Sequence, residues 1–310
     1  MDVDAIVTGV LAREPRAIAR AISLVEDGDD GLPALSAGVF PHTGSAATIG
    51  LTGAPGVGKS TIATALVRTA RANDRRVAVL AIDPTSPYTG GALLGDRVRM
   101  QEHATDPDVF IRSMATRGQL GGLAGATPQA LRVLDAAGCD VVVIETVGVG
   151  QSEVDVVALA DTTVVLLAPG MGDGVQAAKA GILEVADVFV VNKADHHGAG
   201  QAVRELQHVV GLGGHDGWRA PVLRTVASRG EGVDELVAAL DAHRQWADGS
   251  GERERRRVAR AEAEIEAVAV TRLRARIRHV HGGAGLADLA KRVVAGELDP
   301  YAAADELDPG

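Results

Sequence analysis

An eight-residue stretch, Gly53-Ala54-Pro55-Gly56-Val57-Gly58-Lys59-Ser60, combines glycines, a lysine and a hydroxyl at the spacing of a phosphate-binding loop. Its glycines let successive backbone N–H groups converge on an anion, and Lys59 adds a formal positive charge beside them. Ser60 is then placed to bind Mg²⁺. The strand-like run 47–52 and the helix-like run 61–67 flank the stretch, so they favour a nucleotide site over a glycine-rich turn that holds no ligand.

A second candidate site, Asn192-Lys193-Ala194-Asp195, directly follows the apolar run 188–191. The Asp195 carboxylate can accept hydrogen bonds from N1–H and the exocyclic amine of guanine, a pair that adenine cannot offer. Losing this match would leave a buried carboxylate unpaired, so GTP would be favoured over ATP by about 2–5 kcal/mol. Such a string alone is more often an ordinary turn at a strand end. Its place roughly 130 residues after a phosphate loop strengthens the nucleotide interpretation.

Neighbouring residues complete the predicted base site. Lys193 would lay its methylene stem along the base plane, and Asn192 would tie this loop to the phosphate loop. Val226-Ala227-Ser228 follows the next strand and is positioned to offer backbone N–H groups to the guanine O6. We therefore predict that the nucleotide contacts Gly53, Ala54, Pro55, Gly56, Val57, Gly58, Lys59, Ser60, Thr61, Asn192, Lys193, Asp195, Val226, Ala227 and Ser228.

Carboxylates near strand ends are candidates for the Mg²⁺ site, because Mg²⁺ prefers one or two carboxylates together with phosphate oxygens and waters. Asp83 ends the second strand and Asp96 follows it, although either could instead cap a helix. Glu145 ends the strand 141–144, and its longer side chain favours contact through a water. The predicted metal set is Ser60, Asp83, Asp96 and Glu145, and the predicted catalytic set is Lys59, Asp83 and Glu145. The following segment, 148–151, could place a backbone N–H on the γ-phosphate and so sense hydrolysis.

The elements that must position these residues alternate along the chain. Short β-branched runs separated by helical patterns predict an α/β phosphate-loop domain with a mostly parallel sheet, whose ligands bind beyond the carboxyl ends of the strands. The predicted strands are 47–52, 77–82, 109–111, 141–144, 163–167, 188–191 and 221–223.

Helical segments are expected on either side of this domain. Residues 1 to about 42 carry Ile18, Ile22 and Val25 at helical spacing, followed by a helix stop at 27–31, and predict a helical N-terminal extension. A flexible break at 248–251 precedes a long helix, and the last thirty residues look like a short helix and a frayed tail. The predicted domains are 1–42 (helical extension), 43–248 (phosphate-loop domain) and 249–310 (helical dimerisation arm).

The amino-acid composition restricts the kinds of partner and the compartment that we expect for this protein. The formal net charge of −10 argues against nucleic acid or an anionic membrane as the main partner. The run 252–257 is rich in arginine, but interleaved glutamates favour a solvated helix face or an arm that grips a second subunit. Cys139 is the single cysteine, so no intrachain disulfide is possible, which fits a reducing compartment. We expect its side chain to be a small buried apolar group. The acidic start and the lack of a long apolar run predict a cytoplasmic protein.

At these motifs the chain resembles the MeaB/ArgK family of GTPases, which includes the human methylmalonic aciduria type A protein. The resemblance extends over most of the chain, and the run 113–122 is its most diagnostic part. The family often has Ser-Ala where this chain has Val226-Ala227, a change of little consequence for a backbone contact. The motifs that carry the resemblance are 53–61, 83–87, 90–97, 113–122, 145–153 and 192–195.

The resemblance implies a homodimeric G-protein chaperone that binds GTP or GDP with Mg²⁺. Such proteins gate delivery of adenosylcobalamin to methylmalonyl-CoA mutase and protect or reactivate that enzyme, which in turn accelerates GTP hydrolysis. The segment 169–179 resembles the extra switch loop of the family, which makes Asp173 and Lys179 candidates for coupling partner binding to hydrolysis.

Two alternatives from other functional classes remain open at this stage. The first is an ATPase or kinase that serves basic amino-acid transport, which would require ATP preference although Asp195 argues for guanine. The second is a metallochaperone GTPase related to nickel-enzyme maturation factors. Its only hint is the adjacent pair His196-His197, which is more often solvent-exposed loop than a metal ligand set.

Overall fold

The computed structural model describes residues 2–83, 101–103, 105–115, 122–146, 159–170, 185–212 and 217–307. The chain divides into two compact units, Met1–Arg260 and Ala261–Gly310. The first unit therefore contains the predicted extension, the predicted phosphate-loop domain and the first turns of the helix that follows. The predicted limits at residues 42 and 248 stay predictions.

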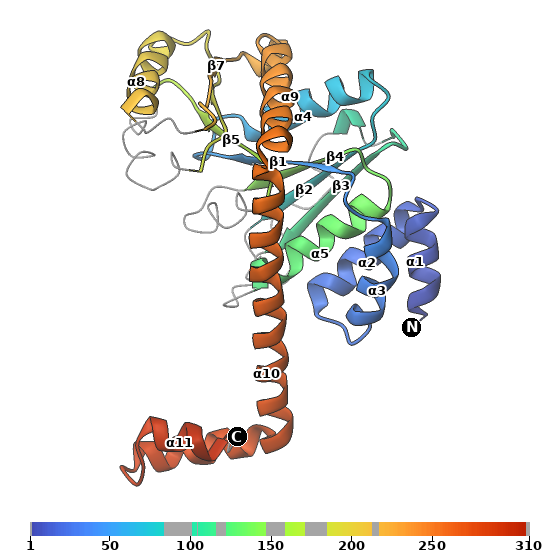
Figure 1. Ribbon diagram of the computed structural model, residues 1–310, viewed down its shortest axis with the longest axis vertical. Coiled ribbons are helices and arrows are strands. Elements are labelled where there is room, and N and C mark those ends of the chain that lie inside the picture. Colours follow the sequence, from blue (N-terminus) through green and yellow to red (C-terminus); the bar gives the residue numbers. More distant parts are fainter. Residues whose placement is uncertain are drawn as a thin grey trace. The chain divides into compact units, whose positions relative to one another are not determined.

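One parallel sheet forms the centre of the first unit (Figure 1). Its order is β3-β2-β4-β1-β5-β6-β7, and every neighbouring pair is parallel. This confirms the predicted α/β class, and each predicted strand lies within one residue of an observed strand at its start. The described strands are β1 (Ala47–Thr52), β2 (Val77–Asp83), β3 (Val109–Ala115), β4 (Val141–Thr146), β5 (Thr162–Leu167), β6 (Val188–Val191) and β7 (Val222–Arg224).

Both faces of the sheet are buried because successive side chains of each strand point to opposite sides. In β2, Val77 and Val79 pack into a cluster with helices α4 and α9, whereas Ala78 and Leu80 pack with the N-terminal helices and α5. A third cluster joins Phe189 of β6 to α8. The covering helices are α4 (Lys59–Ala72), α5 (Gly122–Ala136), α8 (Ala199–Leu212) and α9 (Val233–Ser250).

The N-terminal extension consists of three helices rather than one continuous pattern. These are α1 (Val3–Leu11), α2 (Pro15–Asp27) and α3 (Leu32–Val39), followed by the 3₁₀ turn η1 (Phe40–His42). Ile18, Ile22 and Val25 lie in one helix as predicted and are buried, and Gly28 ends α2 with a φ of 66°. Cys139 is buried in the same cluster, and burial raises the pKa of its thiol to about 12, which agrees with its predicted role as a small hydrophobe.

The C-terminal helices correct two expectations. The predicted break at 248–251 is shorter than expected, because α9 continues to Ser250 and only Gly251, with a φ of 73°, separates it from α10 (Glu252–Val294). The predicted short helix near the end of the chain is present as α11 (Pro300–Leu307), but the predicted frayed tail is wrong, because α10 extends to Val294. In the second unit, Arg292 donates to Glu306 at 2.6 Å and ties the two helices together.

A buried polar cluster fixes the start of α10 to the sheet. Asp187, just before β6, accepts both guanidinium nitrogens of Arg256 at 2.9 Å and the backbone N–H of Thr163 at 2.8 Å. His243 of α9 is fully buried, with Nε2 3.1 Å from Asp187 Oδ1 and Nδ1 2.8 Å from the hydroxyl of Thr162. One carboxylate therefore contacts β5 and the two consecutive helices α9 and α10.

Burial by itself would raise the pKa of Asp187, but hydrogen bonds from His243 and Arg256 outweigh burial and hold the pKa below its usual range. Since the folded-state pKa is lower than the unfolded one, the ionised carboxylate stabilises the fold above about pH 4. This contribution is lost as the pH falls through the folded-state pKa.

We expect Asp187→Asn to lower the free energy of unfolding at pH 7 by about 2–4 kcal/mol, because Arg256 loses its buried counter-ion. Urea denaturation followed by circular dichroism measures this change. Asp241→Asn on α9 is the matched control, since Asp241 is exposed and makes no ion pair with any described residue, and its effect should stay within about 0.5 kcal/mol. Equal effects of the two substitutions would contradict a structural role for the cluster.

Candidate nucleotide site

The parallel sheet brings the sequence motifs to one edge. The phosphate loop follows β1, Glu145 lies near the end of β4, and Asn192 follows β6 directly. Val226 and the 3₁₀ turn η5 (Ala227–Arg229) follow β7. Because the carboxyl ends of parallel strands meet at the same edge, residues separated by more than 130 positions surround one site.

Two glycines of the phosphate loop let neighbouring segments pack closer to the backbone than a residue with a Cβ would allow. Gly53 has a φ of 139°, and a Cβ there would lie 2.2 Å from the backbone oxygen of Leu166. Gly58 caps α4 with a φ of 99°, and a Cβ there would lie 2.3 Å from Asn192 Nδ2. The motif glycines are therefore required by contacts with β5 and with the base loop, besides any contact with a ligand.

The charged and hydroxyl residues of the loop are held at the start of α4. The Lys59 ammonium is buried and donates to the carbonyls of Gly53 and, at 3.2 Å, Ala54 of its own loop. Ser60 and Thr61 are exposed in the first turn of the helix. A helix N-terminus, free backbone N–H groups and an ammonium at one place suit a phosphate group.

The Asn192 side chain joins the phosphate loop to the base loop. It is buried, and its Nδ2 donates to Val57 O at 2.9 Å. Its Oδ1 accepts the hydroxyl of Thr225 at 2.9 Å and the backbone N–H of Ala227 at 3.2 Å. The structure thus shows the link between the two loops that the sequence predicted.

The remaining base-site residues lie beside this link. Lys193 has a φ of 55°, an uncommon conformation for a residue with a side chain. The side chain of Asp195 is about one-third exposed, and Arg229 Nη2 lies 3.2 Å from its Oδ2. Ala227 is buried and Ser228 exposed. Sequence reasoning missed Arg229, although its position directly after the predicted Val226-Ala227-Ser228 segment could have indicated it.

The candidate metal residues are only partly described. Ser60 Oγ donates to Glu145 Oε1 at 2.5 Å, and Glu145 is 2% exposed. A carboxylate and a hydroxyl held together beside a phosphate loop form a donor set of the kind that Mg²⁺ prefers. Asp96 lies outside the described residues, as do the side chain of Asp83 and the predicted switch residues 148–151, Asp173 and Lys179.

Two further features of the described residues concern a metal site and a membrane span. His196 and His197 are both exposed, and the described residues contain no group of three metal-binding side chains that could hold an ion. None of the described helices combines the length and the apolar character that a membrane span requires.

Comparison with known proteins identifies the family. A family model described as methylmalonyl-CoA mutase-associated GTPase MeaB matches residues 18–281. A Pyrococcus abyssi protein named "Putative GTPase" is 46% identical over 309 residues, which cover 98% of this chain and 95% of that protein. GTPase ArgK of Escherichia coli is 38% identical over 237 residues, or 73% of this chain and 71% of its own.

A solved structure shows the same architecture. The crystal structure titled LAO/AO transport system kinase superimposes with a TM-score of 0.70 at 25% identity, covering 99% of this chain and 96% of that one. These matches confirm the family resemblance and the GTPase activity that the motifs predicted. The chain therefore belongs to the MeaB family of methylmalonyl-CoA mutase-associated GTPases.

Proposed function

We propose that this GTPase binds guanine nucleotide with Mg²⁺ at the carboxyl edge of the sheet and acts as a G-protein chaperone for methylmalonyl-CoA mutase. The observation that best supports the nucleotide site is the buried Asn192 amide, which hydrogen-bonds to the phosphate loop and to the segment after β7. A triphosphate tail and a purine base are the two parts of one ligand that such joined loops can hold.

Each loop residue has a defined task in this proposal. The Lys59 ammonium exchanges the carbonyls of Gly53 and Ala54 for phosphate oxygens, and loop N–H groups hold the same phosphates. Asp195 exchanges Arg229 for the guanine N1–H and amine. Ser60 and Glu145 are the residues that would hold Mg²⁺, which would supply positive charge beside the β- and γ-phosphates.

Hydrolysis in this site depends on positioning and charge. Water attacks the γ-phosphorus, the bond to the bridging oxygen breaks, and GDP and phosphate are released. Lys59 and the loop N–H groups stabilise negative charge on the transferred group. No described residue is assigned to position the attacking water, so we propose slow basal turnover and a stimulating partner.

The partner proposal rests on the family and on the second unit. The description of the matched family names its members as methylmalonyl-CoA mutase-associated GTPases. We propose that GTP binding and hydrolysis gate adenosylcobalamin delivery to the mutase, and that the chain works as a homodimer. Ile265, Leu273 and Leu286 are 50–69% exposed in residues 261–310. Such exposed apolar side chains along one helical segment support a dimerisation arm.

We expect Asp195→Asn to weaken GDP binding by about 30-fold or more, because the side-chain N–H donor of asparagine would face the N–H donor of the guanine amine. Xanthine carries a carbonyl oxygen in place of that amine, so XDP affinity should rise in the same variant. Isothermal titration calorimetry with GDP, XDP and ADP measures both changes. Glu231→Gln removes a nearby exposed charge and should leave GDP affinity unchanged. Unaltered base preference in Asp195→Asn would overturn the proposed base site.

We expect Gly58→Ala to reduce GDP affinity at least tenfold, since the new Cβ would displace the Asn192 amide and the φ of 99° disfavours alanine. Fluorescence titration with a labelled GDP measures the affinity. The control is Gly249→Ala in α9, where a Cβ meets no atom within 4 Å and helix propensity improves. Full affinity in a folded Gly58→Ala protein would show that the bridge is dispensable.

We expect the isolated protein to hydrolyse GTP slowly, below about 1 s⁻¹, and the mutase to accelerate it about tenfold or more. Phosphate release measured with and without cobalamin-dependent methylmalonyl-CoA mutase tests both parts. A basal rate near about 100 s⁻¹ would contradict the regulatory mechanism. Slow turnover without any stimulation would remove the chaperone proposal and leave the GTPase intact.

A further inference from the structure

A cavity of about 520 Å³ lies in the first unit at the edge of the sheet opposite the nucleotide site. Its wall includes the first residues of β1, Val141 at the start of β4 and Thr162 at the start of β5. The phosphate loop, by contrast, follows the other end of β1. This cavity is therefore separate from the proposed GTP site, and its size suits a small organic molecule.

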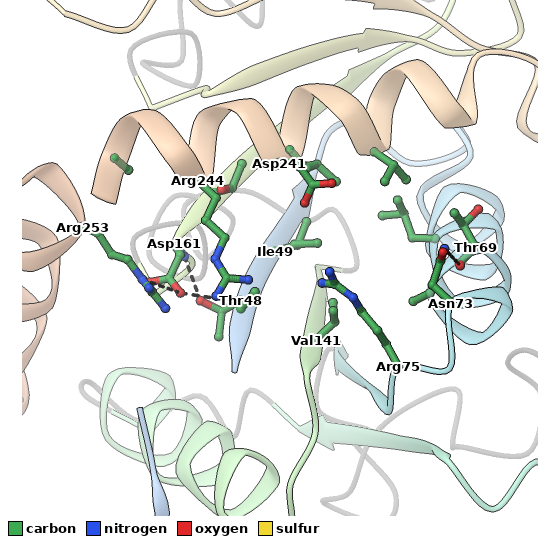
Figure 2. A pocket seen from close by; sticks show the side chains of 17 residues that line it. Thr48, Ile49, Thr69, Asn73, Arg75, Val141, Asp161, Asp241, Arg244 and Arg253 are labelled. Atoms are coloured by element: carbon green, nitrogen blue, oxygen red, sulfur yellow. Dashed lines mark hydrogen bonds and ion pairs between the residues drawn. The ribbon is translucent and has the colours of Figure 1, made fainter. Parts of the chain in front are cut away.

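Helices α4 and α9 provide much of the remaining wall. Leu66 of α4 and Leu240 of α9 are buried beside Ile49 of β1, which makes one side of the cavity apolar. Figure 2 also shows charged side chains in the wall, with Arg244 of α9 and Arg75, which follows α4, pointing into the cavity. The cavity thus combines an apolar wall with polar groups, as ligand sites usually do.

Two of its three arginines have no side-chain partner among the residues that the structure describes. The side chains of Arg75 and Arg244 form no hydrogen bond or ion pair with any residue that the structure describes. The third, Arg253, donates to Asp248 at 3.1 Å and lies 3.9 Å from Asp161. A guanidinium is always charged at neutral pH, and its planar fork matches the two oxygens of a carboxylate or phosphate.

The acidic groups of the wall do not cancel this positive charge. Asp161 accepts a hydrogen bond from Arg260 at 2.6 Å, and nearby arginines hold its pKa below the usual range despite burial. Asp241 and Arg75 are both exposed, whereas Arg244 is half-buried. The cavity therefore has more arginine charge than its carboxylates neutralise, and the excess lies on Arg75 and Arg244.

We infer that this cavity is a second ligand site, which takes a small organic anion with one carboxylate or phosphate group and an apolar portion. The anionic group lies between Arg75 and Arg244, and the apolar portion packs against Ile49, Leu66 and Leu240. Charge-assisted bidentate hydrogen bonds hold the head group. The inference does not depend on the proposed guanine site, because the cavity and the phosphate loop lie at opposite ends of β1 and α4.

Binding to the nucleotide-free full chain tests this inference directly. We expect hexanoate or hexyl phosphate to shift the ¹³C-methyl NMR signal of Ile49. This signal is assigned as the one that disappears in the variant Ile49→Val. The two probes distinguish carboxylate from phosphate recognition. Neutral 1-hexanol and cationic hexylamine should shift the signal less at the same concentrations. Thermal unfolding of each variant establishes that it is folded before titration.

Substitution of the arginines makes the test specific. Arg75→Gln and Arg244→Gln should each weaken binding of the better anion about tenfold, because each removes one charge-assisted pair. Arg16→Gln on α2 is the matched control, since Arg16 is exposed, lies outside the cavity wall and carries the same charge. No shift of Ile49 by either anion at millimolar concentration overturns the inference, and so does equal affinity in the three variants.

Discussion

The geometry of the nucleotide site depends on one buried amide. Asn192 satisfies the carbonyl of Val57 with its nitrogen, and it satisfies Thr225 and Ala227 with its oxygen. An unpaired buried polar group costs about 1–3 kcal/mol, so these bonds define one position of each loop relative to the others. Such an arrangement is possible only because all strands are parallel, which places the carboxyl ends of β1, β6 and β7 on one edge.

This arrangement has a consequence for binding. The loops are already joined before any nucleotide arrives, so less ordering is needed when the ligand binds. Two residues of the proposed nucleotide site have protein partners without a ligand, because Lys59 donates to loop carbonyls and Asp195 pairs with Arg229. Nucleotide binding in the proposed mode would exchange these contacts for contacts with the ligand, so Lys59 and Asp195 would have a partner at either stage.

Much of this site could be predicted from local sequence, and the reasons are physical. A glycine loop between a strand and a helix has one compatible geometry, and the run 188–191 placed Asn192 at a strand end. Arg229 directly follows the predicted Val226-Ala227-Ser228 segment, but its contact with Asp195 spans 34 positions, so local sequence did not indicate this partner. The sequence Asp248-Gly249-Ser250-Gly251 indicated a break, but a single helical glycine costs only about 1 kcal/mol, and Ala247 is buried in α9.

The same elements connect the two ends of the sheet. β1 begins at the cavity and ends at the phosphate loop, while α4 begins at Lys59 and its last turns line the cavity. Each element is packed on the sheet in one hydrophobic cluster that includes Leu51, Ile62 and Leu66. Closely packed interiors transmit displacement rather than absorb it, so a ligand between Arg75 and Arg244 would act on elements that also carry the phosphate loop. A difference in the ligand's affinity between nucleotide states would couple the two sites equally in both directions.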